Sequence, residues 1–384
     1  RPMSILQRFE PEGREFTDPC TGARIRQLTD WRAHSYHLYF THLDRWDQGR
    51  RMLIASERHN APNLYSVELA DGALTRLTDF GPDDRPGLLT AFANPCRDEA
   101  YLVCGDELRA LELRTGRMRT LYTAPRGQRP GMHSCTADGQ TVCLATQEDL
   151  SGRIRMDLGH GYVGFRECFE ARPHCQIVAV GVDGGPARVV HEERAWLGHV
   201  NTSPCLPNVL TFCHEGPWEL VDQRMWTLDL AGGTVRPLRP QAPGEAIGHE
   251  YWLADGERVG YHGRSAECVA RDGWVRHDGS EGAEYDFPRG STHFHSRDET
   301  LIIGDGGRAE PNLLLWRLGP DGYEQPRVLA EHRGSFHTQV LHVHPRLVAD
   351  CDGVLRVVYT ADPNGYGNVF VAEVGDVDAL PVAP

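Results

Sequence analysis

The chain has 384 residues, of which 40% are hydrophobic and 24% charged, as in an ordinary globular protein with a sizeable core. Its formal net charge of -14 argues against a nucleic-acid partner, because phosphate binding needs a concentrated basic surface. No apolar run approaches the length of a membrane span, so we expect no membrane partner either. The sequence contains no lysine, and its carboxylate-binding cations are therefore arginines, which are planar bidentate donors.

The N-terminal stretch RPMSILQRFEPEGREF has no long apolar core, so we expect no signal peptide. The 11 cysteines are scattered, without a CxxC pair or a disulfide framework. We interpret them as small buried hydrophobic residues in a reducing compartment, and we expect a cytoplasmic location.

Short apolar or alternating runs bounded by Gly, Pro, Asp and Asn predict β-strands along most of the chain. Amphipathic helical periodicity over three or more turns is absent, which favours an all-β fold. In chain order, the clearest strand-like runs are residues 52–56, 100–105, 141–146, 176–182, 209–214, 300–306 and 357–362.

A hairpin pattern also repeats, with two strands joined by an Asp-Gly, Thr-Gly or Gly-Gly turn. The units with this pattern are residues 63–79, 108–124, 175–192, 224–240 and 312–331. They recur at intervals of roughly 45–50 residues, which is the period of four-stranded propeller blades. Dividing the chain by this period gives about seven blades. A non-closing solenoid or a stacked sandwich is the structural alternative.

The two ends of the chain favour the closed ring. Residues 21–30 resemble only the outer end of a unit, and residues 368–374 resemble an inner strand without an outer partner. We therefore predict a single domain over residues 1–384, a seven-bladed β-propeller of four-stranded antiparallel blades in which N- and C-terminal segments share a blade. Residues 155–172 interrupt the repeat, either as an insertion over the channel mouth or as a long connection within a blade.

Near the C-terminus, Gln339 precedes His342 and His344. The two imidazoles share a face if the backbone is extended, whereas Gln339 needs a turn or bulge to join them. Neutral imidazoles and an amide oxygen suit a divalent ion such as Mn²⁺, Ni²⁺, Co²⁺ or Zn²⁺. A histidine-rich surface loop is the alternative for this pair alone. Further histidines stand at strand-like edges beside aromatic or acidic residues, namely His199, His214, His249 and His293.

Four segments resemble the oligogalacturonate lyase family: residues 199–226, 249–261, 292–306 and 339–345. HEGPW followed by DQRMW is the most specific element, and the similarity runs over essentially the full chain. The resemblance implies a seven-bladed propeller that cleaves short oligogalacturonates, which are small acidic oligosaccharides, by β-elimination. It also implies a divalent metal, usually Mn²⁺, with Co²⁺, Ni²⁺, Mg²⁺ or Ca²⁺ as alternatives. Because residues 262–287 do not align clearly, the uronate specificity is less well defined than the reaction type.

The same resemblance assigns the metal ligands to His293, Gln339, His342 and His344. This neutral set leaves the ion its full charge for an acidic substrate. His295 competes with His293, since the segment THFH holds both, and the family pattern selects His293. A hydrogen-bonded strand histidine is the structural alternative for either residue.

His249, in HEYW, matches the proton-abstracting base of the family, and its neighbour Glu250 either orients it or caps a turn. A neutral histidine suits this role because its ordinary pKa lies near neutrality. Packing in the core is the alternative. Arg224, in DQRMW, matches the substrate cation, and a guanidinium can bind a uronate carboxylate bidentately. A structural ion pair with Asp222 or Glu219 is the competing interpretation.

Four further residues are predicted to bind substrate. His199 and His214 would line the channel, Trp218 would stack on a sugar ring, and Arg58 is a weaker candidate. Turn packing is the alternative for Trp218. Two other functions fit the sequence: a lyase of the same mechanism acting on another uronate oligosaccharide, and a non-catalytic propeller that only binds. A hydrolase is disfavoured, since no acid pair stands in a comparable context.

Overall fold

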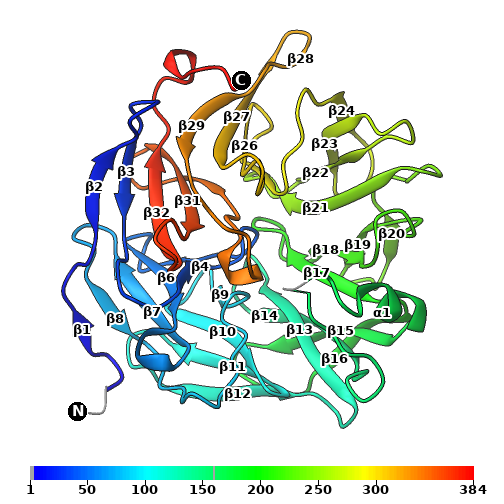
Figure 1. Cartoon of the computed structure of the whole chain (residues 1–384). Helices are drawn as coiled ribbons and strands as arrows, with labels where there is room; N and C mark the ends of the chain where they lie inside the picture. Colours follow the sequence, from blue (N-terminus) through cyan, green and yellow to red (C-terminus); the bar gives the residue numbers. More distant parts are fainter. Residues whose placement is uncertain (1–3, 159–160) are drawn as a thin grey trace.

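The computed structural model describes residues 4–158 and 161–384. The strands of these residues form seven antiparallel sheets arranged as the blades of a ring around a central channel (Figure 1). This arrangement confirms the predicted all-β, seven-bladed propeller and excludes the solenoid and the stacked sandwich. Three of the seven sheets gain a fifth or sixth strand beyond the four that were predicted.

The first three blades follow one another along the chain. Blade 1 contains β1 (Arg8–Phe9), β4 (Ser35–His37), β5 (Arg45–Trp46), β6 (Arg51–Ser56), β7 (Asn63–Glu68) and β8 (Leu74–Arg76). Blade 2 contains β9 (Phe92–Ala93), β10 (Glu99–Cys104), β11 (Glu107–Glu112) and β12 (Met118–Thr123). Blade 3 contains β13 (Gln128–Cys135), β14 (Thr141–Glu148), β15 (His174–Gly181) and β16 (Arg188–Arg194).

The next three blades repeat the pattern. Blade 4 contains β17 (Leu197–Thr202), β18 (Val209–His214), β19 (Met225–Asp229) and β20 (Val235–Pro237). Blade 5 contains β21 (Ala246–Trp252), β22 (Arg258–Arg264), β23 (Ala270–Arg276) and β24 (Gly282–Asp286). Blade 6 contains β25 (Phe294–Ser296), β26 (Leu301–Gly304), β27 (Asn312–Gly319), β28 (Gly322–Tyr323) and β29 (Arg327–Glu331).

Blade 7 joins the two ends of the chain. It contains β2 (Arg14–Thr17), β3 (Arg24–Gln27), β30 (Arg346–Ala349), β31 (Leu355–Ala361) and β32 (Asn368–Glu373). Ile25 of β3 pairs with Ala372 of β32, so backbone hydrogen bonds between the terminal segments close the sheet. β1 pairs instead with β8 of blade 1, where Arg8 lies opposite Thr75. The N-terminal segment therefore contributes strands to two blades. The pairing of β1 with β8 was not predicted from the sequence.

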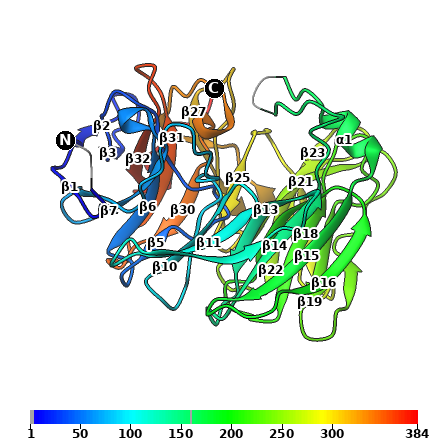
Figure 2. The ribbon, with the colours of Figure 1, turned by 90° about the horizontal axis from the view of Figure 1, so that it is seen from below.

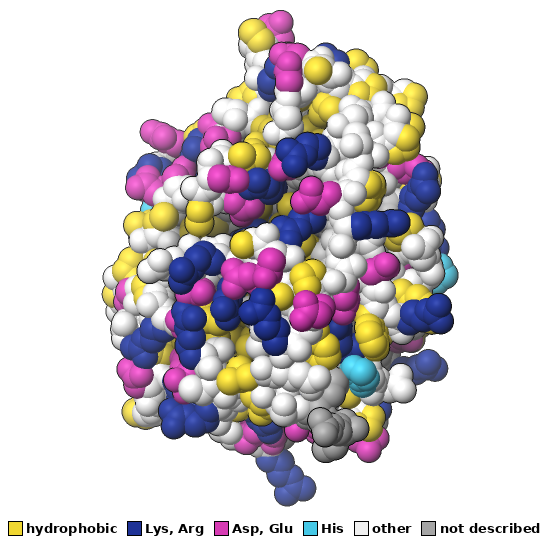
Figure 3. Space-filling view, turned by 90° about the vertical axis from the view of Figure 1, so that its left-hand side faces the viewer, with side chains coloured by type: hydrophobic (Ala, Val, Ile, Leu, Met, Phe, Trp, Pro, Cys, Tyr) yellow, Lys and Arg dark blue, Asp and Glu magenta, His cyan; other side chains and the backbone are white. Residues whose placement is uncertain are grey.

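The apolar core lies between neighbouring blades. Ile303 and Leu315 of blade 6, for example, pack in one cluster with Val357 and Tyr359 of blade 7. A blade strand is covered on both faces by the adjacent blades, so its sequence reads as a continuous apolar run rather than an alternating one. β6 shows this pattern, with every residue from Met52 to Ser56 buried. The outer wall carries interleaved arginine and acidic side chains, as Figure 3 shows for one side of the ring.

The segment 149–173 connects β14 to β15 within blade 3 and contains the helix α1 (Phe165–Ala171). Gly159 and His160, which fall in the predicted interruption, lie outside the described residues. α1 lies at the upper rim of the ring in Figure 2. Two other short elements, η1 (Arg58–Asn60) and η3 (Val377–Ala379), are 3₁₀ turns. No helix among the described residues is long and apolar enough to cross a membrane.

All 11 cysteines are free, as expected from the absence of a disulfide framework. The interpretation that they are small buried hydrophobic residues is wrong for about half of them, because the turns between strands expose several. The exposed ones are Cys20, Cys96, Cys205, Cys268 and Cys351.

Candidate active site

A cavity of about 960 Å³, here called the first cavity, lies on the face of the ring that carries α1. It is reached by the inner strands of several blades and by segment 149–173, through Leu158, Tyr162 and Phe165. The segment thus connects two strands of one blade and also lies at the channel mouth, so both interpretations of the interruption hold. The polar residues that line the first cavity include His199, Glu215, Trp218, Arg224, His249, His262, His293 and Gln339.

Two of these histidines are placed by β-bulges in the inner strands. The pairing of β17 with β18 shifts between Gly198 and Asn201, and that of β21 with β22 shifts between Gly248 and Tyr251. His199 and His249 sit in these bulges with φ of 49° each, in the left-handed region that non-glycine residues rarely adopt. A bulge redirects a side chain that regular alternation would aim elsewhere. The recurring Gly-His dipeptide in LGHV and IGHE was the sequence signal for it.

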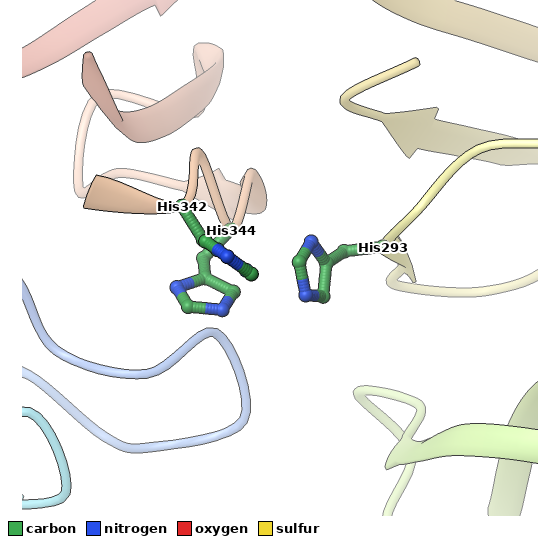
Figure 4. A group of neighbouring side chains, drawn as sticks. All are labelled: His293, His342 and His344. Carbon is green, nitrogen blue, oxygen red and sulfur yellow. The ribbon is translucent and has the colours of Figure 1, made fainter. Parts of the chain in front are cut away.

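Three of the four predicted metal ligands come together. One ring nitrogen from each of His293, His342 and His344 lies within 4.8 Å of the others. Figure 4 shows His342 and His344 on one loop facing His293 from the opposite side. The HxH pair is not part of a strand, so the condition of an extended backbone is met only in part: both residues follow the 3₁₀ turn η2 (Gln339–Leu341), His342 is extended, and His344 has φ of 45°.

The donor set fits a divalent ion. Nδ1 of His342 and Nε2 of His344 are buried without any hydrogen-bond partner. Nδ1 of His293 is 2.6 Å from Oδ2 of Asp305, which leaves its Nε2 to face the other two rings. Asp305 also accepts a hydrogen bond from the backbone N–H of His293, at 2.9 Å. Metal-binding histidines are oriented by carboxylates in this way. Burial acts to raise the pKa of Asp305, but the facing His293 holds it below its ordinary value.

Gln339, the fourth predicted ligand, lines the first cavity at the start of η2. The turn that the sequence required is therefore present. Tyr162, from segment 149–173, lines the same cavity and remains 54% exposed.

His249 is held by a residue that the sequence analysis did not select. Its Nδ1 lies 3.0 Å from Nε2 of the buried His262, and its Nε2 makes no hydrogen bond with any described residue. Burial, reinforced by the nearby His293, lowers the pKa of His249 well below its ordinary value and keeps the ring neutral. Burial likewise lowers the pKa of His262 to about 3. For His249 to keep a lone pair on Nε2, its Nδ1–H must donate to Nε2 of His262.

The family resemblance implies that His249 is the proton-abstracting base. On that assignment, replacing His262 by leucine removes the acceptor that orients the base, so we expect kcat on an oligogalacturonate to fall by at least about tenfold, as for other groups that orient a catalytic histidine. His262→Gln keeps an acceptor near the same position and is expected to restore much of the rate. KM should change little in both variants, because His262 acts through His249. Steady-state kinetics of the two variants test this expectation. Equal kcat values for His262→Leu and His262→Gln would contradict it.

Arg224 is buried in a network of two carboxylates. Its Nε donates to Glu250 at 3.1 Å and its Nη1 to Glu215 at 3.1 Å, and the side chain is 2% exposed. The proposed ion-pair partners Asp222 and Glu219 are therefore wrong, although an ion pair does exist. Nη2 makes no hydrogen bond with any described residue, and Arg224 lines the first cavity. The network fixes the guanidinium and leaves one edge for a ligand.

His199 and Trp218 also lie in the first cavity. Nε2 of His199 is 3.4 Å from Oε2 of Glu215. Although burial acts to raise the pKa of Glu215, Arg224 and His199 hold it far below its ordinary value. The Trp218 ring packs edge-on against His249, with ring centroids 5.8 Å apart. A Cβ on Gly248 would come within 2.4 Å of Trp218, so this glycine is needed for the close approach.

The other predicted site residues lie elsewhere. Nε2 of His214 faces Glu193 at 3.1 Å, outside the first cavity. His295 does not line it either. Burial, and then the cations of Arg346 and Arg297, lower the pKa of His295 well below its ordinary value.

Arg58 is fully buried at the edge of blade 1 and does not reach the first cavity. Its guanidinium pairs with Glu12 at 2.6 Å and lies over the rings of Phe9, Trp31 and Tyr65. The prediction that Arg58 binds substrate is not supported by this position. Its contacts instead tie the N-terminal segment to the ring.

We therefore expect Glu12→Ala to lower the free energy of unfolding by about 3 kcal/mol, because it leaves a buried cation without its partner. Asp71→Ala breaks the exposed Arg8–Asp71 pair of the same segment and should cost less than about 1 kcal/mol. Urea unfolding of both variants measures the difference. Equal losses would contradict the anchoring role.

Residues 11–313 match the sequence model of the oligogalacturonate lyase family. The chain belongs to the oligogalacturonate lyase family. Among curated relatives of this family member, an oligogalacturonide lyase of Pectobacterium atrosepticum is 26% identical over 94% of this chain and 96% of its own length. An oligogalacturonate lyase of Dickeya dadantii is 25% identical over the same shares.

Solved structures of oligogalacturonate lyases share the fold. One, in complex with manganese, superposes with a TM-score of 0.86 at 24% identity, covering 97% of this chain and 99% of that one. Another, from Vibrio parahaemolyticus, gives a TM-score of 0.85 at 24% identity over the same shares. The family resemblance and the fold that it implied are thereby confirmed.

Proposed function

We propose that this protein is a metal-dependent carbon–oxygen lyase that cleaves digalacturonate and short oligogalacturonides by β-elimination. Family membership supports this activity, as do the names of both curated relatives. The single observation in the structure that carries it is the convergence of His249, Arg224 and His293 at one cavity, with a ring nitrogen of His342 and of His344 within 4.8 Å of one of His293.

His293, His342 and His344 would hold the ion, with the amide oxygen of Gln339 as the fourth protein ligand. When bound, a divalent ion supplies a Lewis acid for the uronate carboxylate, which makes the adjacent C5 proton more acidic. Three neutral imidazoles and an amide preserve the charge of the ion for this purpose. We propose Mn²⁺, the ion named with one structural relative, and this ion accepts nitrogen and oxygen ligands.

His249 would take the proton from C5 through Nε2. The electron pair of the C5–H bond then forms the C4–C5 double bond, and the bond from C4 to the glycosidic oxygen breaks. The leaving oxygen gains a proton to complete a shortened galacturonide, and the other product is a 4,5-unsaturated uronate. His262 accepts from Nδ1–H of His249 and would thereby stabilise the imidazolium that forms.

Arg224 would position the substrate carboxylate through Nη2. Because Glu215 and Glu250 flank the guanidinium, its role is that of an oriented donor rather than an unscreened cation. A hydrogen bond from a charged, fixed donor stabilises negative charge that develops in the transition state. His199 and Trp218 lie beside Arg224 and His249, respectively, and we assign them to substrate binding.

We further propose that the protein acts in the cytoplasm at a late step of pectin degradation, on the small products of earlier cleavage. The first cavity, at about 960 Å³, has room for a short oligosaccharide.

A lyase assay on digalacturonate tests the proposal. Chelator-treated protein should show no rise in the ultraviolet absorbance of the new double bond, and added Mn²⁺ should restore it. No rise with Mn²⁺, Co²⁺ or Ni²⁺ would contradict the proposal. Cleavage of another uronate oligosaccharide under those conditions would indicate the same mechanism on a different substrate, and no cleavage at all would indicate a propeller that only binds.

A further inference from the structure

A second cavity, of about 910 Å³, is lined by a different set of residues toward the C-terminal ends of the inner strands. The mechanism uses none of them. Phe40 is fully buried, lines the second cavity and lies between residues of the two cavities. The ring of Phe40 touches His249 and His293 of the first cavity and His295 of the second, with centroids 5.8–6.4 Å apart.

Blade 6 contributes lining residues to both cavities. His293, His295 and Arg297 alternate along β25 and its flanks, so their side chains share a face at steps of about 6.6 Å. His293 lines the first cavity, whereas His295 and Arg297 line the second. The two histidines of THFH therefore belong to different sites.

The second cavity presents hydrogen-bond donors without partners. Nδ1 of His295 accepts from the backbone N–H of Leu347 at 3.1 Å, so the neutral ring carries its proton on Nε2. That Nε2 makes no hydrogen bond with any described residue. Asn201 is 3% exposed, and both atoms of its side-chain amide lack partners. Buried polar groups are normally satisfied, so an unpaired amide at a cavity wall indicates a ligand position.

The charges around these donors favour a monoanion. The guanidinium of Arg297 forms no ion pair and no hydrogen bond with any described residue. Arg346, which also lines the cavity, is already paired with Asp44 at 3.2 Å. The other lining arginines, Arg45, Arg97 and Arg114, also pair with carboxylates, so Arg297 is the lining cation without a carboxylate partner among the described residues. A carboxylate matches this charge and the planar guanidinium geometry, whereas a doubly charged phosphate would exceed it.

The same cavity has an aromatic wall. The ring of Tyr251 stacks on His295, with centroids 5.2 Å apart and an angle of 29° between the planes. Trp252 and Phe92 line the cavity as well. Flat apolar surfaces of this kind bind the carbon face of a compact ring, next to the donors that bind its charge.

We propose that the second cavity binds a small organic monocarboxylate, such as a monomeric sugar acid, independently of the first cavity. Arg297 pairs with the carboxylate, Nε2 of His295 and the amide of Asn201 bind its polar substituents, and Tyr251 and Trp252 cover the ring. A ligand here would contact Phe40, whose ring also contacts His249 and His293 of the first cavity.

Calorimetric titration of metal-free protein with galacturonate tests this inference, because this monomer has no glycosidic bond to cleave and binding is read without turnover. We expect Arg297→Gln to weaken one galacturonate site by about tenfold or more, the loss for a charged hydrogen-bond partner, while kcat/KM on digalacturonate stays unchanged. Arg126→Gln removes the same charge from an exposed loop and should leave binding intact.

Asn201→Leu provides a second variant that keeps every charge and should weaken the same site. A crystal soaked with galacturonate should show the sugar acid against Arg297. Unchanged binding in Arg297→Gln, or density only in the first cavity, would overturn the proposal. Tighter binding of inorganic phosphate than of galacturonate would overturn the assignment to a carboxylate. These binding results can be interpreted even if the lyase assay shows no activity.

Discussion

Replacing His249 by alanine is expected to lower kcat on digalacturonate by about 10²–10⁴-fold, the range that a positioned general base contributes. The physical reason is that the neutral Nε2 of His249 is free, while its Nδ1 is engaged by His262 at 3.0 Å. No other described histidine of the first cavity shows this pattern together with a bulge that turns its side chain toward the cavity. Steady-state kinetics on the Mn²⁺-loaded enzyme measure the loss.

The control for this variant is His277→Ala, in the hairpin between β23 and β24 and outside the first cavity. It removes one imidazole and should keep the wild-type rate. Thermal unfolding of both variants separates loss of the base from loss of the fold. A His249→Ala enzyme with more than about one-tenth of the wild-type kcat would assign proton abstraction to another group.

The second large effect concerns the ion. We expect His342→Ala to abolish tight Mn²⁺ binding, because it removes one of the three converging imidazoles. Asp305→Asn should weaken Mn²⁺ binding by about 10–100-fold, the usual cost of losing a carboxylate that orients a ligand histidine. Titration of free Mn²⁺ by electron paramagnetic resonance measures affinity directly, without reference to turnover.

His337→Ala is the matched control, since His337 is exposed on the same loop and should leave Mn²⁺ affinity unchanged. The described residues also contain a second set of close potential ligand atoms, from His199, Cys213 and Glu215. If His342→Ala kept its Mn²⁺ while Glu215→Gln lost it, the ion would belong to that set, and the proposed ligand assignment would be wrong.

Local patterning was sufficient to predict the fold. The repeated hairpins and their spacing predicted seven blades, and strands such as β6 and β15 lie close to the predicted runs. The pairing of β1 with β8 was not predictable, because two residues carry too little periodicity to identify a strand. The extra strand β5 was not predicted for the same reason.

Residue chemistry and family resemblance brought out His249, Arg224 and the His293–His342–His344 set, and all five lie together at the candidate site. Arg58 and His214 were assigned to substrate binding but lie outside the first cavity. A sequence shows which residues are polar but not which carboxylate each one pairs with. Glu12, the partner of Arg58, lies 46 positions away in the chain, so only the folded structure brings the two together.

The sequence by itself thus determined the blade repeat and the residue types of the site, since both depend on patterns within a few dozen residues. Only the tertiary structure decided which side chains share a cavity. The bulges place His199 and His249 at the first cavity, and His262 contacts His249. Phe40 lies between His293 of the first cavity and His295 of the second. These relations depend on how separate blades meet around the channel, and that meeting is fixed by packing between residues far apart in the chain.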